Sequence, residues 1–199
     1  MKNRKKLKVG GRFDMIIGLV VQNNYFASWD FVKCILLLPP KYGFISIQSH
    51  SVPDNRNRVW DKVKDTDNDL LFIDADMTFM PEDVQKAEEH LKTYDVMTGV
   101  YKLADQNYAL LNRNKEDTDY KFILPREGVN EVDAAGAGFL AISHRIYKKL
   151  PDNPFSNLWE GNIIHGEDVS FCHRLRERGI KLFYDNDIKL GHIRTTIIK

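Results

Sequence analysis

The stretch Asp69-Leu-Leu-Phe-Ile-Asp-Ala-Asp-Met-Thr-Phe-Met-Pro81 carries four apolar residues directly into two aspartates that one alanine separates. An uninterrupted apolar run rich in β-formers predicts an inner strand covered on both faces, as in the parallel sheets of α/β proteins. Ligands of open α/β sheets bind beyond the carboxyl ends of the strands. We therefore expect Asp74 and Asp76 at the edge of the sheet where such a fold does its chemistry.

Two interpretations of Asp74 and Asp76 stay open on these residues alone. Carboxylates at positions i and i+2 around a turn can converge on one hard cation, and Mg²⁺ or Mn²⁺ commonly takes one or two carboxylates together with substrate phosphates. The alternative is a turn whose acids cap the helix that Pro81-Glu-Asp83 opens. Both interpretations place the pair directly after a buried strand.

Length and composition bound the class of protein. A chain of 199 residues with 43% hydrophobic content can form one domain with a substantial core. The 29 Lys and Arg residues nearly balance the 28 Asp and Glu residues, so the bulk charge gives no indication of nucleic acid as a partner. We divide the chain into a basic arm over residues 1–13 and a single domain over 14–199, whose two halves are 14–101 and 102–199.

Cysteine usage and hydropathy bear on location. Cys34 and Cys172 are the two cysteines, and each lies in an apolar helical pattern, which predicts free thiols in a reducing compartment such as the cytoplasm. No apolar run reaches the roughly 18 residues of a membrane-spanning helix, and no signal peptide opens the sequence. We expect no transmembrane segment, and any membrane contact is expected to be peripheral.

The rest of the chain alternates strands with helices, which predicts an α/β fold with a mostly parallel central sheet flanked by helices. The predicted strands cover 15–21, 42–47, 69–76, 95–101, 180–184 and 188–193, with a strand-like segment over 132–142. Helices are predicted over 29–36 behind Ser28, through 55–58 into the apolar residues up to 63, over 81–92, over 143–150, and from 167 to Gly179. Between 102 and 130, short apolar pieces fit either small antiparallel strands or a mobile loop.

Three further segments carry residues suited to a ligand. Arg56 and Arg58 are expected near a helix start, where the helix dipole would favour a phosphate between them, although two solvated arginines explain them as well. Gly136 and Gly138 interrupt a strand-like segment and mark either a ligand-facing bulge or a tight packing corner. Glu167-Asp168 opens a helix, where the dipole selects acids whether or not they have a function.

Taken in order, these elements resemble the GT-A class of nucleotide-sugar glycosyltransferases, in particular the small family-2-like transferases of phages and large DNA viruses. The resemblance spans roughly residues 14–192. It rests on the first strand 15–21, Arg56-Asn57, the Asp-x-Asp at 74–76, Gly136-Ala-Gly-Phe139, Gly166-Glu-Asp-Val-Ser-Phe-Cys172 and Gly191-His192. It implies that residues 14–101 carry the nucleotide and that residues 102–199 form the acceptor side. If a virus encodes the chain, we expect the protein in the cytoplasm of the host cell.

The resemblance also implies an activity, which is the metal-dependent transfer of a sugar from a nucleotide-sugar donor, UDP-sugar favoured, with inversion. The acceptor would be a hydroxyl group of a glycan, glycoprotein or glycolipid. Mn²⁺ or Mg²⁺ would bind Asp74, Asp76 and His192 and stabilise the charge on the leaving diphosphate. The donor would contact Gln22, Arg56, Asp74, Ala75, Asp76, Gly136 and Gly138.

On the acceptor side, Asp168 matches the position of the base that takes the proton from the acceptor hydroxyl, with Glu167 as the second candidate. Two adjacent carboxylates that face one site would repel each other and spread their pKa values, so one can act as base while Glu167 binds acceptor hydroxyls. Trp159 is a further acceptor-binding candidate, as an apolar platform for a sugar ring.

Two departures from the family pattern weaken the prediction of how the nucleotide base of the donor is recognised. Gln22-Asn23 stands where many members carry Pro-Thr, and Gln48-Ser-His50 replaces the usual acidic pair after the second strand. A nucleotidyltransferase of the same fold is one alternative, but it would need a Gly-rich basic loop where Gln22-Asn-Asn-Tyr25 stands. A non-catalytic nucleotide- or carbohydrate-binding module is the other.

Overall fold

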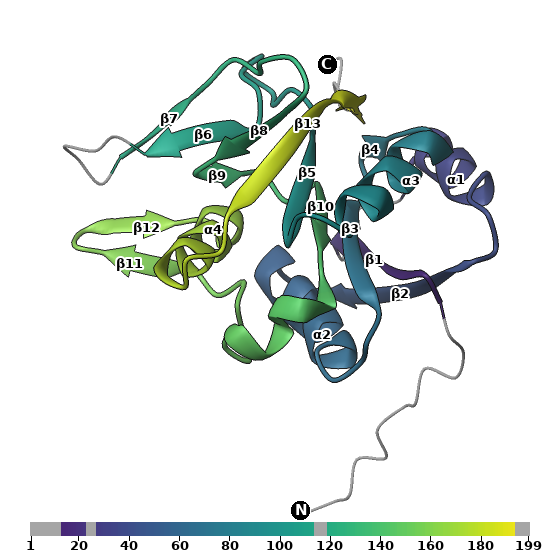
Figure 1. Cartoon of the computed structure of the whole chain (residues 1–199), viewed down its shortest axis with the longest axis horizontal. Helices are drawn as coiled ribbons and strands as arrows, with labels where there is room; N and C mark the ends of the chain where they lie inside the picture. Colours follow the sequence, from purple (N-terminus) through teal and green to yellow (C-terminus); the bar gives the residue numbers. More distant parts are fainter. Residues whose placement is uncertain (1–12, 23–26, 114–118, 194–199) are drawn as a thin grey trace, which may run out of the picture.

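A mixed seven-stranded sheet forms the centre of the molecule (Figure 1). The computed structural model describes residues 13–22, 27–113 and 119–193, so the predicted basic arm lies outside the described residues apart from Phe13. The strand order is β2-β1-β3-β10-β5-β13-β8. In chain order the strands are β1 (Met15–Gln22), β2 (Tyr42–Ser49), β3 (Asp69–Asp74), β5 (Val96–Val100), β8 (Val129–Val132), β10 (Phe139–Ile142) and β13 (Leu182–Lys189).

Most strands of this sheet run in one direction. β1 pairs in parallel with β2 and β3, and β5 pairs in parallel with β13. β10 lies antiparallel between β3 and β5, so β3 and β5 point the same way, and β8 is antiparallel to β13 at the edge. The prediction of an α/β fold with a mostly parallel sheet is confirmed.

Both faces of the sheet are covered, as predicted for the stretch that ends at the two aspartates. Leu70 and Phe72 of β3 belong to one hydrophobic core, shared with helices α2 (Val52–Val63) and α4 (Glu167–Glu177). Leu71 and Ile73 belong to a second core, shared with α1 (Trp29–Leu36) and α3 (Pro81–His90). All four side chains are fully buried. Alternate residues of a strand point to opposite faces, so burial of all four requires that both faces of the sheet are covered.

The start of α1 is predicted correctly and the start of α2 is not. Ser28 caps α1 by accepting the N–H of Phe31 at 3.0 Å. α2 begins at Val52, earlier than predicted, because Ser51 caps it and Pro53 suits a first helical turn. Arg56 and Arg58 therefore lie inside the helix, and the prediction that they stand at its start is wrong.

The C-terminal strands also differ from the prediction. Residues 180–184 and 188–193 do not form two strands around a turn; β13 continues through 185–187, and a short strand β14 (Gly191–His192) follows. The register between β13 and β5 shifts between Tyr184 and Lys189. Asp185 stays buried in the strand because its carboxylate lies 2.8 Å from His90 Nε2.

Smaller elements surround the central sheet. β6 (Leu110–Arg113), β7 (Tyr120–Phe122) and β9 (Ala134–Ala135) form an antiparallel sheet, which confirms the small strands between 102 and 130. β11 (Leu158–Glu160) pairs with β12 (Ile163–His165), and β4 (Met77–Thr78) pairs with β14. Residues 132–142 are divided among β8, β9 and β10, and the helix predicted at 143–150 is the 3₁₀ helix η1 (His144–Lys149). In Figure 1, the β6–β7 and β11–β12 hairpins extend from the same side of the sheet.

The two cysteines are free thiols, with Cys34 half-buried and Cys172 buried. Burial raises the pKa of the Cys172 thiol to about 12, so this side chain stays neutral and serves packing. Within residues 13–22, 27–113 and 119–193, no helix has the length and apolar character to cross a membrane.

Candidate active site

The carboxyl edge of the sheet brings together acids from distant parts of the chain. Asp74 is the last residue of β3, and Glu167 and Asp168 form the first turn of α4. Arg56 of α2 lies between them. Four of the predicted site residues, Arg56, Asp74, Glu167 and Asp168, therefore lie near one another, although about ninety residues of chain, counted from the element bounds, separate β3 from α4.

Arg56 joins the two groups of acids. Its side chain is buried, at 2% exposure, and its Nη2 lies 2.9 and 3.0 Å from the two oxygens of Asp74. Its Nε lies 3.6 Å from Glu167 Oε1. Burial alone would lower the pKa of Arg56, but the two carboxylates outweigh burial and raise it. Arg58 is exposed and pairs with Asp54 at 2.9 Å, so the second predicted arginine does not face these acids.

Several buried polar atoms beside Arg56 lack a hydrogen-bond partner in the described part of the chain: Arg56 Nε and Nη1, Asp74 Oδ1 and Asn55 Oδ1. Asp74 Oδ1 is close to Nη2 but lacks hydrogen-bond geometry. Such a group costs about 1–3 kcal/mol when nothing satisfies it, so a cluster of them at a sheet edge indicates a site for water or a ligand.

Asn55 is a site residue that the sequence did not single out. It is fully buried, and its Nδ2 donates to the carbonyl of Val21 at 2.8 Å, near the end of β1. The amide thus fixes α2 against the first strand and leaves its oxygen unpaired. Asn55 directly precedes Arg56 in the sequence, but its burial could be predicted only once α2 was known to contain both residues.

The Asp168 carboxylate, at the start of α4, has a raised pKa. Burial, reinforced by the neighbouring charge of Glu167, raises the pKa of Asp168 to about 6. Its Oδ1 accepts the N–H of Val169 at 2.7 Å, which fixes the carboxylate at the start of α4. A carboxylate with a pKa near 6 is well matched to proton transfer near neutral pH. Burial also raises the pKa of Asp74, against the opposing effect of Arg56.

Asp76 and His192 form a separate pair. β14 runs antiparallel to β4 and places His192 opposite Met77. His192 Nε2 lies 3.2 Å from Asp76 Oδ2, and its Nδ1 lies 3.1 Å from the carbonyl of Lys102. The Asp76 side chain is 53% exposed, so a ligand can reach it.

The Asp76–His192 pair fits a divalent cation, whereas Asp74 faces Arg56 instead. A carboxylate and an imidazole are an O/N donor set that divalent first-row metals accept. Within the described ranges, no group of three or more His, Cys, Asp or Glu side chains is arranged to hold a metal. Two protein ligands are nevertheless sufficient where substrate phosphates and water complete the coordination, as Mg²⁺ commonly requires.

Tyr101 is a second residue that the sequence did not single out. The residue follows β5 and is buried, its hydroxyl accepts the N–H of Gly138 at 3.1 Å, and its ring meets that of His192 edge-on at 5.7 Å between centroids. A Cβ at Gly136 would lie 2.3 Å from the Tyr101 hydroxyl oxygen, and one at Gly138 would lie 2.9 Å from it. The glycines therefore form a tight packing corner around this phenol. A tyrosine at the carboxyl end of a predicted inner strand was the available signal.

Gly138 also connects this packing corner to the end of β3, because its carbonyl accepts the N–H of Asp74 at 3.0 Å. Ala75 is buried and donates its N–H to the carbonyl of Val20 at 3.1 Å. Gln22 ends β1, and residues 23–26 after it lie outside the described part. The donor contacts predicted for Gln22, Ala75, Gly136 and Gly138 stay predictions.

Trp159 lies on the β11–β12 hairpin. It is 67% exposed and stands opposite Ile164, which is 50% exposed. The hairpin runs through Gly166 directly into α4, so the exposed ring is held on the segment that precedes Asp168. Its acceptor contact stays a prediction.

Comparison with protein-family models and with curated proteins gives no match at the level of sequence. Comparison with solved structures does. The A197 protein from STIV superposes with a TM-score of 0.60 over 93% of this chain and 97% of its own, at 19% identity. GalNAc-T7, in a structure with UDP, GalNAc and Mn²⁺, has a TM-score of 0.58 over 92% of this chain and 38% of its own, at 14% identity.

A Desulfovibrio desulfuricans G20 protein assigned to the nucleotide-diphospho-sugar transferases gives a TM-score of 0.52 at 13% identity, over 92% of this chain and 83% of its own. Identities this low bear on the fold alone. The fold is that of the GT-A nucleotide-diphospho-sugar transferases, and the fold prediction is confirmed. The narrower resemblance to small family-2-like enzymes stays a prediction.

Proposed function

We propose that this protein is a metal-dependent glycosyltransferase that moves a sugar from a nucleotide-sugar donor, UDP-sugar favoured, to an acceptor hydroxyl with inversion. The observation that carries the proposal is the half-buried Asp168, with a pKa raised to about 6, beside the Arg56–Asp74 pair. A binding module has no need of a carboxylate held ready for proton transfer. The GT-A fold supports the same reaction class.

On the donor side, Asp76 and His192 would hold Mn²⁺ or Mg²⁺. The bound cation would stabilise charge on the departing diphosphate without a proton. Asp74, held by Arg56, would accept a hydrogen bond from the ribose. The N–H groups of Arg56 that lack a partner would bind donor oxygens and satisfy the buried guanidinium.

On the acceptor side, Asp168 would take the proton from the acceptor hydroxyl. The acceptor oxygen bonds to the anomeric carbon while the bond from that carbon to the diphosphate oxygen breaks, and the proton ends on the Asp168 carboxylate. Glu167, which is oriented by Arg56, would bind neighbouring acceptor hydroxyls. Trp159 would offer an apolar face to an acceptor ring on a glycan, glycoprotein or glycolipid.

The test is a screen of nucleotide sugars for hydrolysis and transfer, with Mn²⁺ and with a chelator, on the full chain. Asp168→Asn is expected to lower turnover about 10²- to 10⁴-fold while UDP binding in Mn²⁺ is kept. Glu177→Gln, at the exposed far end of the same helix, serves as the matched control and should keep full turnover. Absence of hydrolysis and of binding for every nucleotide sugar in both conditions would refute the proposal.

The metal assignment has its own test. Asp76→Asn and His192→Ala should each weaken UDP binding in Mn²⁺ and have little effect on UDP binding in chelator, because the two side chains act through the cation. Equal losses in both conditions would show that they do not hold a metal.

A further inference from the structure

A pocket of about 400 Å³ lies beside His192, on the side of the sheet order formed by β5 and β13. Lys102 and Tyr108 line it from the segment after β5, and Asn186 and Lys189 line it from β13. Its volume is within the range of about 300–1,000 Å³ that is typical of ligand sites. The pocket shares Tyr101 and His192 with the candidate active site.

The charge of this pocket is what distinguishes it. Two lysines and no acidic residue line it. Within the described residues, neither Lys102 nor Lys189 has a carboxylate within ion-pair distance. Lys102 Nζ instead lies 5.3 Å from the centroid of the Tyr108 ring, a contact that holds an ammonium group without neutralising it.

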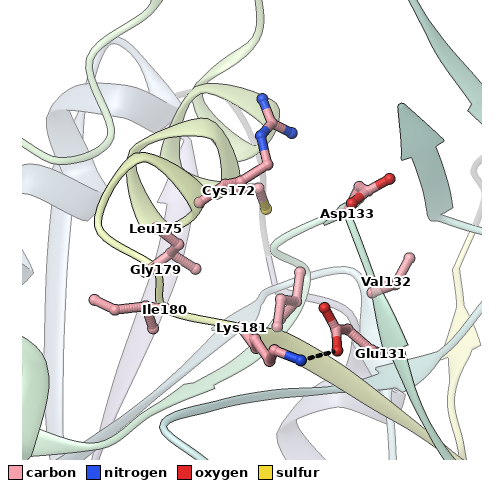
Figure 2. Close-up of a pocket in the computed structure, with 10 residues that line it drawn as sticks. Glu131, Val132, Asp133, Cys172, Leu175, Gly179, Ile180 and Lys181 are labelled. Atoms are coloured by element: carbon pink, nitrogen blue, oxygen red, sulfur yellow. Dashed lines mark hydrogen bonds and ion pairs between the residues drawn. The ribbon is translucent and has the colours of Figure 1, made fainter. Parts of the chain in front are cut away.

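Two other pockets show the contrast. Figure 2 shows a pocket of about 210 Å³ between α4, β8 and β13, where Lys181 is paired with Glu131 at 2.7 Å. A third pocket, near Trp60, contains Lys64, which is paired with Asp152 at 2.7 Å. Each of these two pockets has two acidic residues in its lining, Glu131 and Asp133 in one and Asp65 and Asp152 in the other, whereas the described lining of the pocket beside His192 has two lysines and no acid.

The residue types favour a phosphate. Lysine binds phosphate as a point charge on a flexible chain, and two lysines match a group that carries up to two negative charges. Tyr108 and Asn186 add a hydroxyl and an amide that can donate to its remaining oxygens. Phosphate has more acceptor oxygens than a carboxylate and so makes fuller use of this set.

The position of the pocket decides which ligand carries the phosphate. In the strand order β2-β1-β3-β10-β5-β13-β8, the proposed nucleoside side lies at β1 and β3, and the pocket lies beyond β10 at β5 and β13. The Asp76–His192 pair, which would hold the donor diphosphate, connects the two sides, because Asp76 follows β3 and His192 itself lines the pocket. A phosphate in the pocket is therefore on the side away from the nucleoside. We propose that this pocket, defined by Lys102, Tyr108, Asn186 and Lys189, binds a phosphate group carried by the acceptor; the acceptor assignment rests on the proposed function.

The experiment measures binding of inorganic phosphate and of glycerol phosphate to the full chain by calorimetry in chelator. The variants are Lys102→Met, Lys189→Met and the double variant, and Lys181→Met is the matched control from the pocket of Figure 2. All three lysines are exposed, so the substitutions should leave the fold intact, which circular dichroism checks. Each pocket variant should weaken both probes roughly tenfold, about 1.4 kcal/mol, and the control should not.

UDP in Mn²⁺ is the second arm and separates the two sources of phosphate. The double variant should bind UDP as the wild type does. A parallel loss of UDP affinity would overturn the acceptor assignment, because the phosphate would then belong to the donor. Phosphate binding that is equal in the wild type and the double variant would overturn the site itself. If the chain hydrolyses no nucleotide sugar but still binds phosphate through the two lysines, the acceptor role is removed and only a phosphate site is left. Failure of the proposed function can therefore be distinguished from failure of the phosphate site.

Discussion

Replacing Asp168 with asparagine should make the fold more stable at neutral pH while it lowers turnover. Burial raises the pKa of Asp168 from 3.8 to about 6. Below the lower value, the folded and unfolded chains are both protonated at this residue and the side chain carries no ionisation penalty. As the pH rises towards 6, the unfolded chain ionises first and the folded state loses stability; above 6 the penalty is constant.

The magnitude follows from the size of the pKa shift. Two pKa units correspond to about 3 kcal/mol of destabilisation at high pH. By the same relation the penalty is about 1 kcal/mol at about pH 4.5, so the difference between pH 4.5 and pH 8 is about 2 kcal/mol. Asparagine has no such penalty, and its amide oxygen can still accept the N–H of Val169, as the carboxylate does at 2.7 Å, although a neutral acceptor loses about 1 kcal/mol.

Urea denaturation of the wild type and Asp168→Asn at the two pH values measures this difference. The stability gained by the variant should grow by about 2 kcal/mol from about pH 4.5 to pH 8. Glu177→Gln is the control, because this side chain is 56% exposed at the other end of α4 and should show a much smaller change. A gain that does not depend on pH, or a variant less stable than the wild type at pH 8, would refute the reasoning.

Three other outcomes concern the same site. The rate of transfer should rise about tenfold per pH unit below the Asp168 pKa of about 6 and level off above it; a flat profile of initial rates across this range would contradict the role as base. Arg56→Met removes the buried counter-ion of the half-buried Asp74 carboxylate and should lower the free energy of unfolding by about 2 kcal/mol, whereas Arg58→Met, on the exposed face of the same helix, should change it by less than about 0.5 kcal/mol. Guanidinium denaturation compares the two variants. Gly136→Ala places a methyl group 2.3 Å from the Tyr101 hydroxyl oxygen and should lower the free energy of unfolding by about 1–3 kcal/mol. Tyr101→Phe should recover part of this loss in the double variant. Strictly additive effects in that double-mutant cycle would exclude the contact.

The parts of the fold that the sequence predicted well are those set by local pattern. The four consecutive apolar residues before Asp74 point alternately to the two faces of the sheet, so they leave water only if both faces are covered. Both faces of β3 are covered. Ser28 ends the preceding loop and caps α1 through its own hydroxyl, so the start of the helix is encoded within four residues. In such segments the residues that decide the structure are neighbours in sequence.

The errors occur where a distant partner decides. The polar run that contains Asn55 and Arg56 has the composition of a loop, yet both side chains are buried in a helix, where Asn55 donates to the carbonyl of Val21 and Arg56 donates to Asp74. Asp185 suggests a turn, yet it remains in β13 because its carboxylate meets His90 across 95 residues of sequence. Neither partner can be identified from one sequence.

The candidate site shows the same division. The acids at the ends of strands and helices were predictable, because their positions follow from the elements that carry them. The role of Gly136 and Gly138 was not, because the side chain that requires them small, Tyr101, is about 35 residues earlier in the chain and reaches them only through the sheet order.

Because β14 pairs with β4, the proposed metal site can form only after the chain has been synthesised as far as β14. Asp76 and His192 are separated by 116 residues, and bringing such distant segments together has an entropic cost that only a largely formed sheet can offset. A ribosome would have to deliver the chain as far as His192 before the pair could close. A nascent or proteolysed chain that stops short of β14 could fold its central strands and still lack the Asp76–His192 pair, so metal-dependent binding would report on the docking of β14 against β4 as well as on the fold of the central sheet.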